Sequence, residues 1–205
     1  MKKIFITGIS TEVGKTLVSA IVTEALNSDY WKPIQAGELE HSDTDKVKEM
    51  ITNKKSIFHP NSYALKTPMS PHASAKIDGI EINLKKIIPP KTTNTLVIEG
   101  AGGLLVPLNK KETILDIIAP DYKIIVVSRH YLGSINHTLL TIQLLQQKGY
   151  NPSIIFSGAM LPTTEDIIKN MTGAPVIGRI NEEPEINKKV VKTYANLFKE
   201  KLSLL

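Results

Sequence analysis

Short apolar runs alternate along the chain with longer amphipathic segments. The first run, residues 2–8 (KKIFITG), is rich in β-type residues and ends at a glycine, which favours a strand. Residues 15–28 follow, and their apolar positions recur at helical spacing rather than in alternation. Residues 188–205 close the chain as a predicted helix. Its expected apolar face carries Val191, Tyr194, Leu197, Phe198 and Leu202.

The same alternation fills the rest of the chain. Strands are predicted at residues 29–34, 94–100, 122–128, 152–158 and 174–178. Helices are predicted at 43–53, with Ser42 or Asp43 as the N-cap, and at 134–149; two prolines make 66–72 a loop. We therefore expect one α/β domain spanning residues 1–205, with a mostly parallel central sheet and helices on both faces.

Four residues stand at the ends of predicted strands, namely Gly8, Lys32, Gly100 and Ser157. In open parallel sheets, ligands bind beyond the carboxyl ends of the strands. We expect these four residues to gather along one edge of the sheet.

Composition and charge narrow the possible partners. Hydrophobic residues make up 41% and charged residues 22% of the 205, as in ordinary globular proteins. The absence of cysteine excludes disulfides, thiolate zinc sites and a cysteine nucleophile. The net charge is +5, but only Arg129 and Arg179 are arginines and no dense basic run occurs, so no nucleic-acid partner is expected.

The N-terminal apolar run is short. Ile4, Phe5 and Ile6 are followed at once by Thr7 and Gly8. A signal peptide or a membrane span needs a longer apolar segment. We therefore expect a cytoplasmic protein without a membrane partner.

The stretch GISTEVGKT, residues 8–16, resembles a phosphate-binding loop with altered spacing. Five residues separate Gly8 from Gly14, where the common loop has four. The strand before it and the helix after it are the context that such a loop requires. Backbone N–H groups from Glu12 to Thr16 can wrap a phosphate, Lys15 can reach the β- and γ-phosphates, and the Thr16 hydroxyl can hold Mg²⁺.

A magnesium ion bound here also needs carboxylates. Glu99, at the end of a buried strand, is the best candidate, while Asp43 and Asp45 could serve as ligands or merely cap a helix. The glycines of EGAGG (99–103) allow close approach of the backbone to a ligand, or form a plain tight turn. The five histidines have no metal-ligand spacing, and only His72 merits attention.

Six segments together carry a resemblance to a known family. They are GISTEVGKT, KPIQAG, SDTD, PMSPH, EGAGGLLVPL and LGSINHTLLT. Their order and spacing resemble those of the dethiobiotin synthetases, from Met1 to about Glu185, and the altered phosphate loop resembles that family's own. The resemblance implies a P-loop NTPase fold and the Mg²⁺- and ATP-dependent closure of a ureido ring from 7,8-diaminononanoate and CO₂, through a carbamate and a carbamic–phosphoric anhydride.

The resemblance also implies residue roles. Lys15 and Lys32 resemble the lysines that hold the γ-phosphate and the carbamate, with Thr11 and Glu12 close by. Thr16, Asp43 and Glu99 are similar to the Mg²⁺ ligands. The expected nucleotide contacts are Glu12, Val13, Gly14, Lys15, Thr16, Leu17, Asp43, Glu99, Gly100, Ala101, Gly102, Ser157 and Gly158.

The family's site is completed by a second subunit, so a homodimer is implied. The residues that would reach the neighbour's substrate are Gly133, Ser134, Ile135 and Asn136.

The sequence departs from the family's pattern at two positions near the expected ligands. Ala36 replaces a serine or threonine beside the substrate, and Ser157 with Gly158 replaces an asparagine that reads the adenine edge, which predicts weak discrimination between ATP and GTP. Residues 178–185 only loosely match a second base-side loop.

Two other functions compete with this interpretation. One is another ATPase with a variant phosphate loop, such as an amide synthase or a partitioning ATPase. The other is a nucleotide-binding switch without substrate turnover. The chain lacks the KGGxGKT loop and the glutaminase domain of the first class. The joint presence of Thr11, Lys15, Lys32, Asp43 and Glu99 argues against the second.

Overall fold

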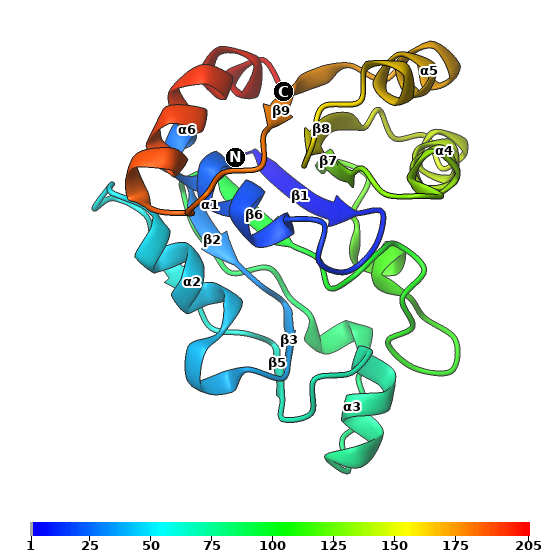
Figure 1. Cartoon of the computed structure of the whole chain (residues 1–205). Coiled ribbons are helices and arrows are strands. Elements are labelled where there is room, and N and C mark those ends of the chain that lie inside the picture. Colours follow the sequence, from blue (N-terminus) through cyan, green and yellow to red (C-terminus); the bar gives the residue numbers. More distant parts are fainter. Residues whose placement is uncertain (1) are drawn as a thin grey trace.

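A computed structural model describes residues 2–205 and shows a central sheet of seven strands (Figure 1). The strand order is β4-β2-β6-β1-β7-β8-β9, and every pair of neighbours is parallel. The strands are β1 (Lys3–Gly8), β2 (Asp29–Trp31), β4 (Phe58–His59), β6 (Leu96–Glu99), β7 (Lys123–Arg129), β8 (Ser153–Ser157) and β9 (Val176–Ile180). The predicted α/β fold class is confirmed.

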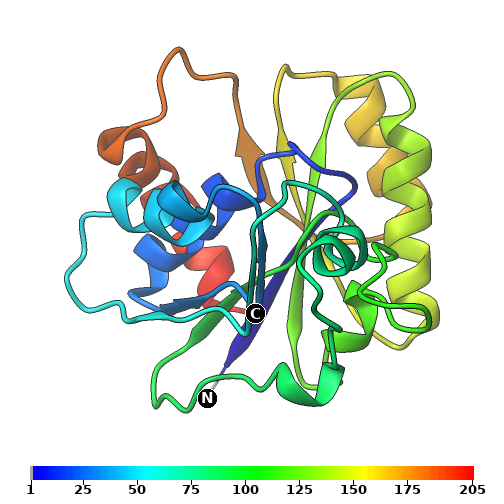
Figure 2. The ribbon, with the colours of Figure 1, turned by 90° about the horizontal axis from the view of Figure 1, so that it is seen from below.

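Helices cover both faces of this sheet (Figure 2). One layer contains α1 (Lys15–Leu26), α2 (Asp43–Met50) and α6 (Lys188–Ser203), and the other contains α4 (Ser134–Gln147) and α5 (Pro162–Thr172). A small parallel sheet of β3 (Ile34–Ala36) and β5 (Tyr63–Leu65) lies beside α3 (Pro71–Ile77). Short 3₁₀ turns occur at residues 39–41, 84–86 and 114–117.

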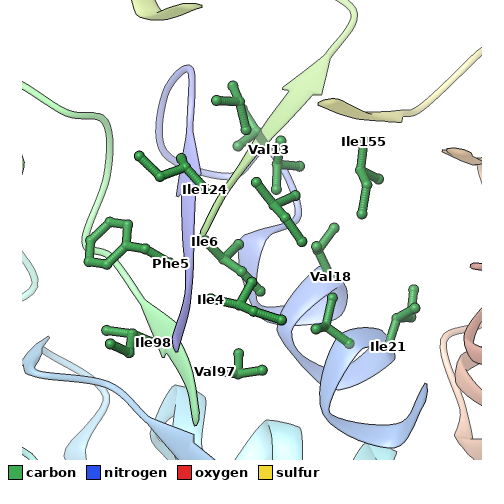
Figure 3. Packing of buried hydrophobic residues seen from close by; sticks show 14 of the residues in the cluster. Ile4, Phe5, Ile6, Val13, Val18, Ile21, Val97, Ile98, Ile124 and Ile155 are labelled. Atoms are coloured by element: carbon green, nitrogen blue, oxygen red, sulfur yellow. The ribbon is translucent and has the colours of Figure 1, made fainter. Parts of the chain in front are cut away.

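The core is built around β1, which lies between β6 and β7. Alternate side chains of a strand point to opposite faces, so Ile4 and Ile6 pack toward Val18 of α1, while Phe5 lies on the other side (Figure 3). Burial of both faces explains why the strand is a continuous apolar run rather than an alternating one.

The predicted strand at 29–34 is wrong in its second half. The chain leaves the main sheet after Trp31 and enters β3, which belongs to the small sheet. Pro33 marks the break because it has no N–H for a sheet ladder, while its carbonyl accepts hydrogen bonds from the N–H groups of Ser62 (2.8 Å) and Tyr63 (3.0 Å). This break leaves Lys32 at the open end of β2.

Two other boundaries also differ from the prediction. The helix predicted at 43–53 ends at Met50, because the carboxylate of Glu24 accepts the N–H groups of Thr52 (2.8 Å) and Asn53 (3.0 Å) and holds them off the helix axis. The predicted loop at 66–72 is wrong at its end, since α3 begins at Pro71, a residue suited to the first helical position.

The expected apolar face of the last helix contains one error. Leu197 is 68% exposed, whereas the other four residues of that face are buried. Tyr194 already lies at one border of the stripe that faces α1, and Leu197, one step further around the helix, falls outside it. Among the described residues, no helix combines the length and the apolar character needed to cross a membrane.

Candidate active site

The phosphate loop connects β1 to α1 and leads directly into the first turn of that helix. Glu12 (φ 54°) and Gly14 (φ 95°) have left-handed backbone conformations, which curl the loop over the helix N-terminus. The Lys15 ammonium folds back across the loop and donates to the carbonyl of Ser10 at 2.9 Å. Burial lowers the pKa of Lys15 to about 8, although the nearby Glu99 carboxylate opposes the shift.

The register of two parallel strands brings Lys32 to Glu99. Tyr30 pairs with Val97 and Trp31 with Ile98, so the next residues in line are Lys32 and Glu99. Their side chains share one face, and Lys32 Nζ lies 3.1 Å from Glu99 Oε1. Both residues are nearly inaccessible, with 5% and 1% exposure. Buried charges of this kind need partners, and here each supplies one for the other.

Lys32 has a second carboxylate partner, Asp43, at the start of α2. Desolvation disfavours the charged form of Lys32, but Glu99 and Asp43 together outweigh it and raise its pKa. Desolvation also opposes ionisation of Asp43, but the positive charge of Lys32 outweighs it, so the pKa of Asp43 is lowered. The site therefore holds the ammonium of Lys32 between the carboxyl groups of Asp43 and Glu99.

Asp43 and Asp45, which the sequence offered as ligands or helix caps, have different partners. Asp45 accepts the N–H (2.9 Å) and the hydroxyl (2.6 Å) of Ser42 and so completes a capping box. Asp43 faces Lys32 instead, and its backbone N–H donates to Gln35 Oε1 at 3.3 Å. Asp43 belongs to the site, whereas Asp45 caps the helix.

Thr16 connects the carboxylates to the phosphate loop, because its hydroxyl donates to Glu99 Oε1 at 2.9 Å. The hydroxyl of Thr16 and the carboxylates of Asp43 and Glu99 form an all-oxygen donor set. Across residues 2–205, no group of three His, Cys, Asp or Glu side chains could hold a metal. Mg²⁺ keeps several waters and needs only one or two carboxylates, so these residues fit it.

A cleft of about 730 Å³ opens beside these groups. The expected site residues that line it are Thr11, Glu12, Gly14, Lys15, Thr16, Lys32, Ala36, Asp43, Glu99, Ala101 and Gly102. Other lining residues lie in the segments that carry the resemblance, although no role was assigned to them, namely Ile34, Gln35, Pro68, Met69, Ser70, Pro71 and Val106. Glu38 and Lys46, which also line the cleft, lie outside those segments.

Several expected nucleotide contacts lie outside this cleft. Val13 is buried under the loop, and Gly100 packs so closely on Phe5 that an added Cβ would lie 3.1 Å from its ring. Ser157 is also buried, and its hydroxyl donates to the carbonyl of Val13 at 2.8 Å. The end of β8 therefore supports the phosphate loop from below. Leu17 packs partly against the core, and Gly158 lies beside Arg129.

The segment from Gly133 to Asn136 begins α4, outside the cleft of its own chain. Gly133 has φ 98° and precedes the helix, and Asn136 is exposed. Next to this segment is a second, largely apolar groove of about 450 Å³, between the phosphate loop, residues 103–107 and α4. Thr11 and Val106 line both the groove and the cleft, which are therefore contiguous.

Two contacts of the site were missed in the sequence. Tyr30 donates to Glu99 Oε2 at 2.9 Å, and Gln35 binds the backbone of Asp43. Tyr30 stands two residues before Lys32, and that spacing puts both on the same face of a strand. This was the available signal, although it does not by itself reveal the partner strand.

Sequence comparisons place this arrangement among known proteins. A family model described as an AAA domain matches residues 2–190. The ATP-dependent dethiobiotin synthetase BioD of Christiangramia forsetii is 59% identical over 202 residues, which cover 98% of each chain. The proteins of the same name from Cytophaga hutchinsonii and Chlamydia pneumoniae are 50% and 41% identical, and cover 95% and 98% of this chain and 96% and 90% of their own.

Solved structures show the same fold at low sequence identity. The Aquifex aeolicus MinC:MinD cell division protein complex contains a chain with a TM-score of 0.63 and 16% identity, covering 100% of this chain and 97% of that one. A putative plasmid partition protein of Borrelia burgdorferi, bound to AMPPNP, has a TM-score of 0.61 and 14% identity, with 100% and 99% coverage. At these identities the likeness concerns the fold alone.

Proposed function

The chain belongs to the family of ATP-dependent dethiobiotin synthetases, and we propose that it closes the ureido ring of dethiobiotin in the cleft beside the phosphate loop. The proposed substrates are 7,8-diaminononanoate, CO₂ and ATP. The observation that carries the assignment to this cleft is the ammonium of Lys32, held between Asp43 and Glu99 opposite the phosphate-loop residue Thr16.

The reaction divides into three bond-forming steps. One amine of the substrate attacks CO₂ and loses a proton, which gives a carbamate. A carbamate oxygen then attacks the γ-phosphorus of ATP, and ADP leaves. Finally, the second amine attacks the carbonyl carbon of the mixed anhydride and loses a proton, while inorganic phosphate leaves and the ring closes.

The second step brings two anions to reacting distance. Lys15 lies on the phosphate-loop side of the cleft and Lys32 on the sheet side. We assign Lys15 to the γ-phosphate and Lys32 to the carbamate, so that their positive charges offset the repulsion between the reacting groups. Thr11 and Glu12, at the mouth of the loop, would contact the substrate.

Mg²⁺ is proposed as the cofactor, held by Thr16, Asp43 and Glu99. When bound, it would offset charge on the β- and γ-phosphate oxygens of ATP. The nucleotide would lie along the loop from Glu12 to Leu17, with Gly100, Ala101 and Gly102 at the strand end beside it. Its base would extend toward Ser157 and Gly158.

A homodimer is proposed because Gly133, Ser134, Ile135 and Asn136 lie outside the cleft of their own chain. The groove beside α4 supports this proposal, since Leu105 and Leu140 at its border are 63% and 58% exposed. A second copy seated there would cover these leucines and bring its own α4 N-terminus to the substrate. The enzyme would work in the cytoplasm.

The test is phosphate release by the purified protein with MgATP and bicarbonate, with and without 7,8-diaminononanoate. Release that requires the diamine, with dethiobiotin as the product, is the expected result. Steady release that ignores the diamine would contradict the proposal and favour another ATPase of the same fold. No release with any nucleotide would leave only a nucleotide-binding role.

A further inference from the structure

Tyr30 is a buried tyrosine whose hydroxyl contacts Glu99, a residue of the candidate site. It lies in the centre of β2, fully buried, and none of the motifs includes it. Its ring packs against Phe58 with the centroids 5.9 Å apart. Phenylalanine would fill the same space, so packing alone does not account for the hydroxyl.

The hydroxyl of Tyr30 donates to Glu99 Oε2 at 2.9 Å. The other oxygen, Oε1, faces Thr16 (2.9 Å) and Lys32 (3.1 Å). The two oxygens of Glu99 therefore have separate partners, one inside the sheet and the other at the cleft. Because a carboxylate is planar, holding Oε2 inside the sheet fixes the direction in which Oε1 faces.

We propose that Tyr30 is a positioning residue, which locks Glu99 so that Oε1 is presented to a divalent cation. The inference rests on the proposed function, because it takes Glu99 as a magnesium ligand. Partners that orient a ligand's second oxygen contribute strongly to metal binding, and their removal typically costs about 10–100-fold in metal affinity or activity. Without the tyrosine hydroxyl, Oε2 of Glu99 loses its partner inside the sheet, and the carboxyl group can rotate.

The test is the substitution Tyr30→Phe, which removes only the hydroxyl. Electron paramagnetic resonance measures the binding of Mn²⁺, as a probe for Mg²⁺, to the protein saturated with a non-hydrolysable ATP analogue. The expected result is a Kd for Mn²⁺ weakened about 10-fold. At saturating metal, the Kd for the ATP analogue should stay within about twofold of the wild-type value, since the phosphate loop is intact.

Tyr150→Phe is the matched control. The Tyr150 hydroxyl also makes one hydrogen bond, to the carbonyl of Ile118 at 2.8 Å, but it lies between α4 and β8 and does not line the cleft. This variant should bind Mn²⁺ as the wild type does. Equal Kd values for Tyr30→Phe and the wild type would overturn the proposal, and so would a wild-type complex that binds no Mn²⁺.

Folding provides a second measurement. If Tyr30→Phe does not fold, a folded double variant Tyr30→Phe/Glu99→Gln supports the proposal, because a neutral amide needs no charged hydrogen bond. If the double variant stays unfolded while the single variant Glu99→Gln folds, the proposal is overturned. None of these measurements uses the diamine, so a failure of wild-type protein to make dethiobiotin would count against the proposed function alone.

Discussion

At the scale of single residues, the centre of the site is an ammonium enclosed by acidic groups. Lys32 forms ion pairs with both Asp43 and Glu99, and water barely reaches Lys32 and Glu99. Removal of one partner from a buried ion pair leaves an uncompensated charge, whereas removal of an exposed lysine does not. Lys32 is therefore important for stability as well as for the proposed chemistry.

We predict that Lys32→Met lowers the free energy of unfolding by about 3–5 kcal/mol and kcat by at least about 100-fold. Urea denaturation and steady-state kinetics measure the two effects. Added Mg²⁺ should restore part of the lost stability, because it supplies a cation between the same carboxylates. Lys46→Met is the control, since Lys46 also lines the cleft but is partly exposed and should cost less than about 1 kcal/mol. Equal losses in both variants would contradict the prediction.

Ala36 lines the cleft, at the position where the family resemblance implies a serine or threonine. Ala36→Ser should add a hydrogen bond of about 0.5–1.5 kcal/mol to the substrate. Steady-state kinetics should then show a KM for 7,8-diaminononanoate lowered roughly 2- to 13-fold. An unchanged or higher KM would show that the added hydroxyl makes no such contact.

The hydroxyl of Ser157 is already used by the carbonyl of Val13, which leaves the nucleobase without that contact. We therefore expect similar values of kcat/KM with ATP and GTP. Ser157→Ala should reduce both by the same factor, because it loosens the phosphate loop rather than a base contact. A hundredfold preference of the wild type for ATP would refute this view.

At the scale of elements, the helices and strands that local sequence patterns define could be predicted. The β1–loop–α1 unit and the long helix α4 were predicted, because apolar periodicity and glycine placement define them locally. The strands β3, β4 and β5 were not, since they have two or three residues each and exist only through pairing with distant segments. The helix α5 was also missed.

For the candidate site too, locally defined features could be predicted and those that depend on distant segments could not. Gly8, Lys32, Gly100 and Ser157 were expected at one edge of the sheet by the rule for parallel strands. The hydrogen bond from Tyr30 to Glu99 could not be predicted, because it depends on the register of two strands 69 residues apart in sequence. Nor could the burial of Ser157, which reflects the position of β8 under the phosphate loop.

Asp29 joins three segments at the start of β2, and its acidity should be visible in the stability of the protein. Its carboxylate accepts hydrogen bonds from Ile57 N (3.0 Å), Thr92 Oγ1 (2.7 Å) and Asn94 Nδ2 (3.1 Å). Desolvation opposes ionisation, but these hydrogen bonds outweigh it and lower the pKa of Asp29. A carboxyl whose pKa is lower in the folded state stabilises the protein above its unfolded pKa of about 4, and this contribution is lost as the pH falls further.

We therefore predict that Asp29→Asn costs about 1–3 kcal/mol at pH 5. The difference from the wild type should shrink as the pH falls from 5 toward 3, a window below the ordinary titration of histidine. Urea denaturation across this range measures it. A difference that is independent of pH would show that the charge of Asp29 contributes nothing.

At the scale of the whole molecule, the two opposite helical layers expose different leucines. Leu140 of α4 borders the groove that is contiguous with the cleft, whereas Leu197 of α6 lies in the other layer. Only the first belongs to the surface proposed to meet a second copy. The pair therefore offers matched substitutions of similar exposure, 58% and 68%.

Light scattering should give twice the monomer mass for the wild type. Leu140→Glu should dissociate the dimer and abolish dethiobiotin formation, because a buried unpaired carboxylate is costly at an apolar interface. Leu197→Glu should remain dimeric and active. A monomeric wild type with full activity would refute the shared site.

The central position of β1 also determines when the site can form during synthesis. This strand is made first, yet it pairs with residues 96–99 and 123–127. About three-fifths of the 205 residues must leave the ribosome before both neighbours exist. The phosphate loop therefore lacks both strands that flank β1 for most of translation. We expect a truncated chain that ends before β7 to form no nucleotide site and to bind no ATP.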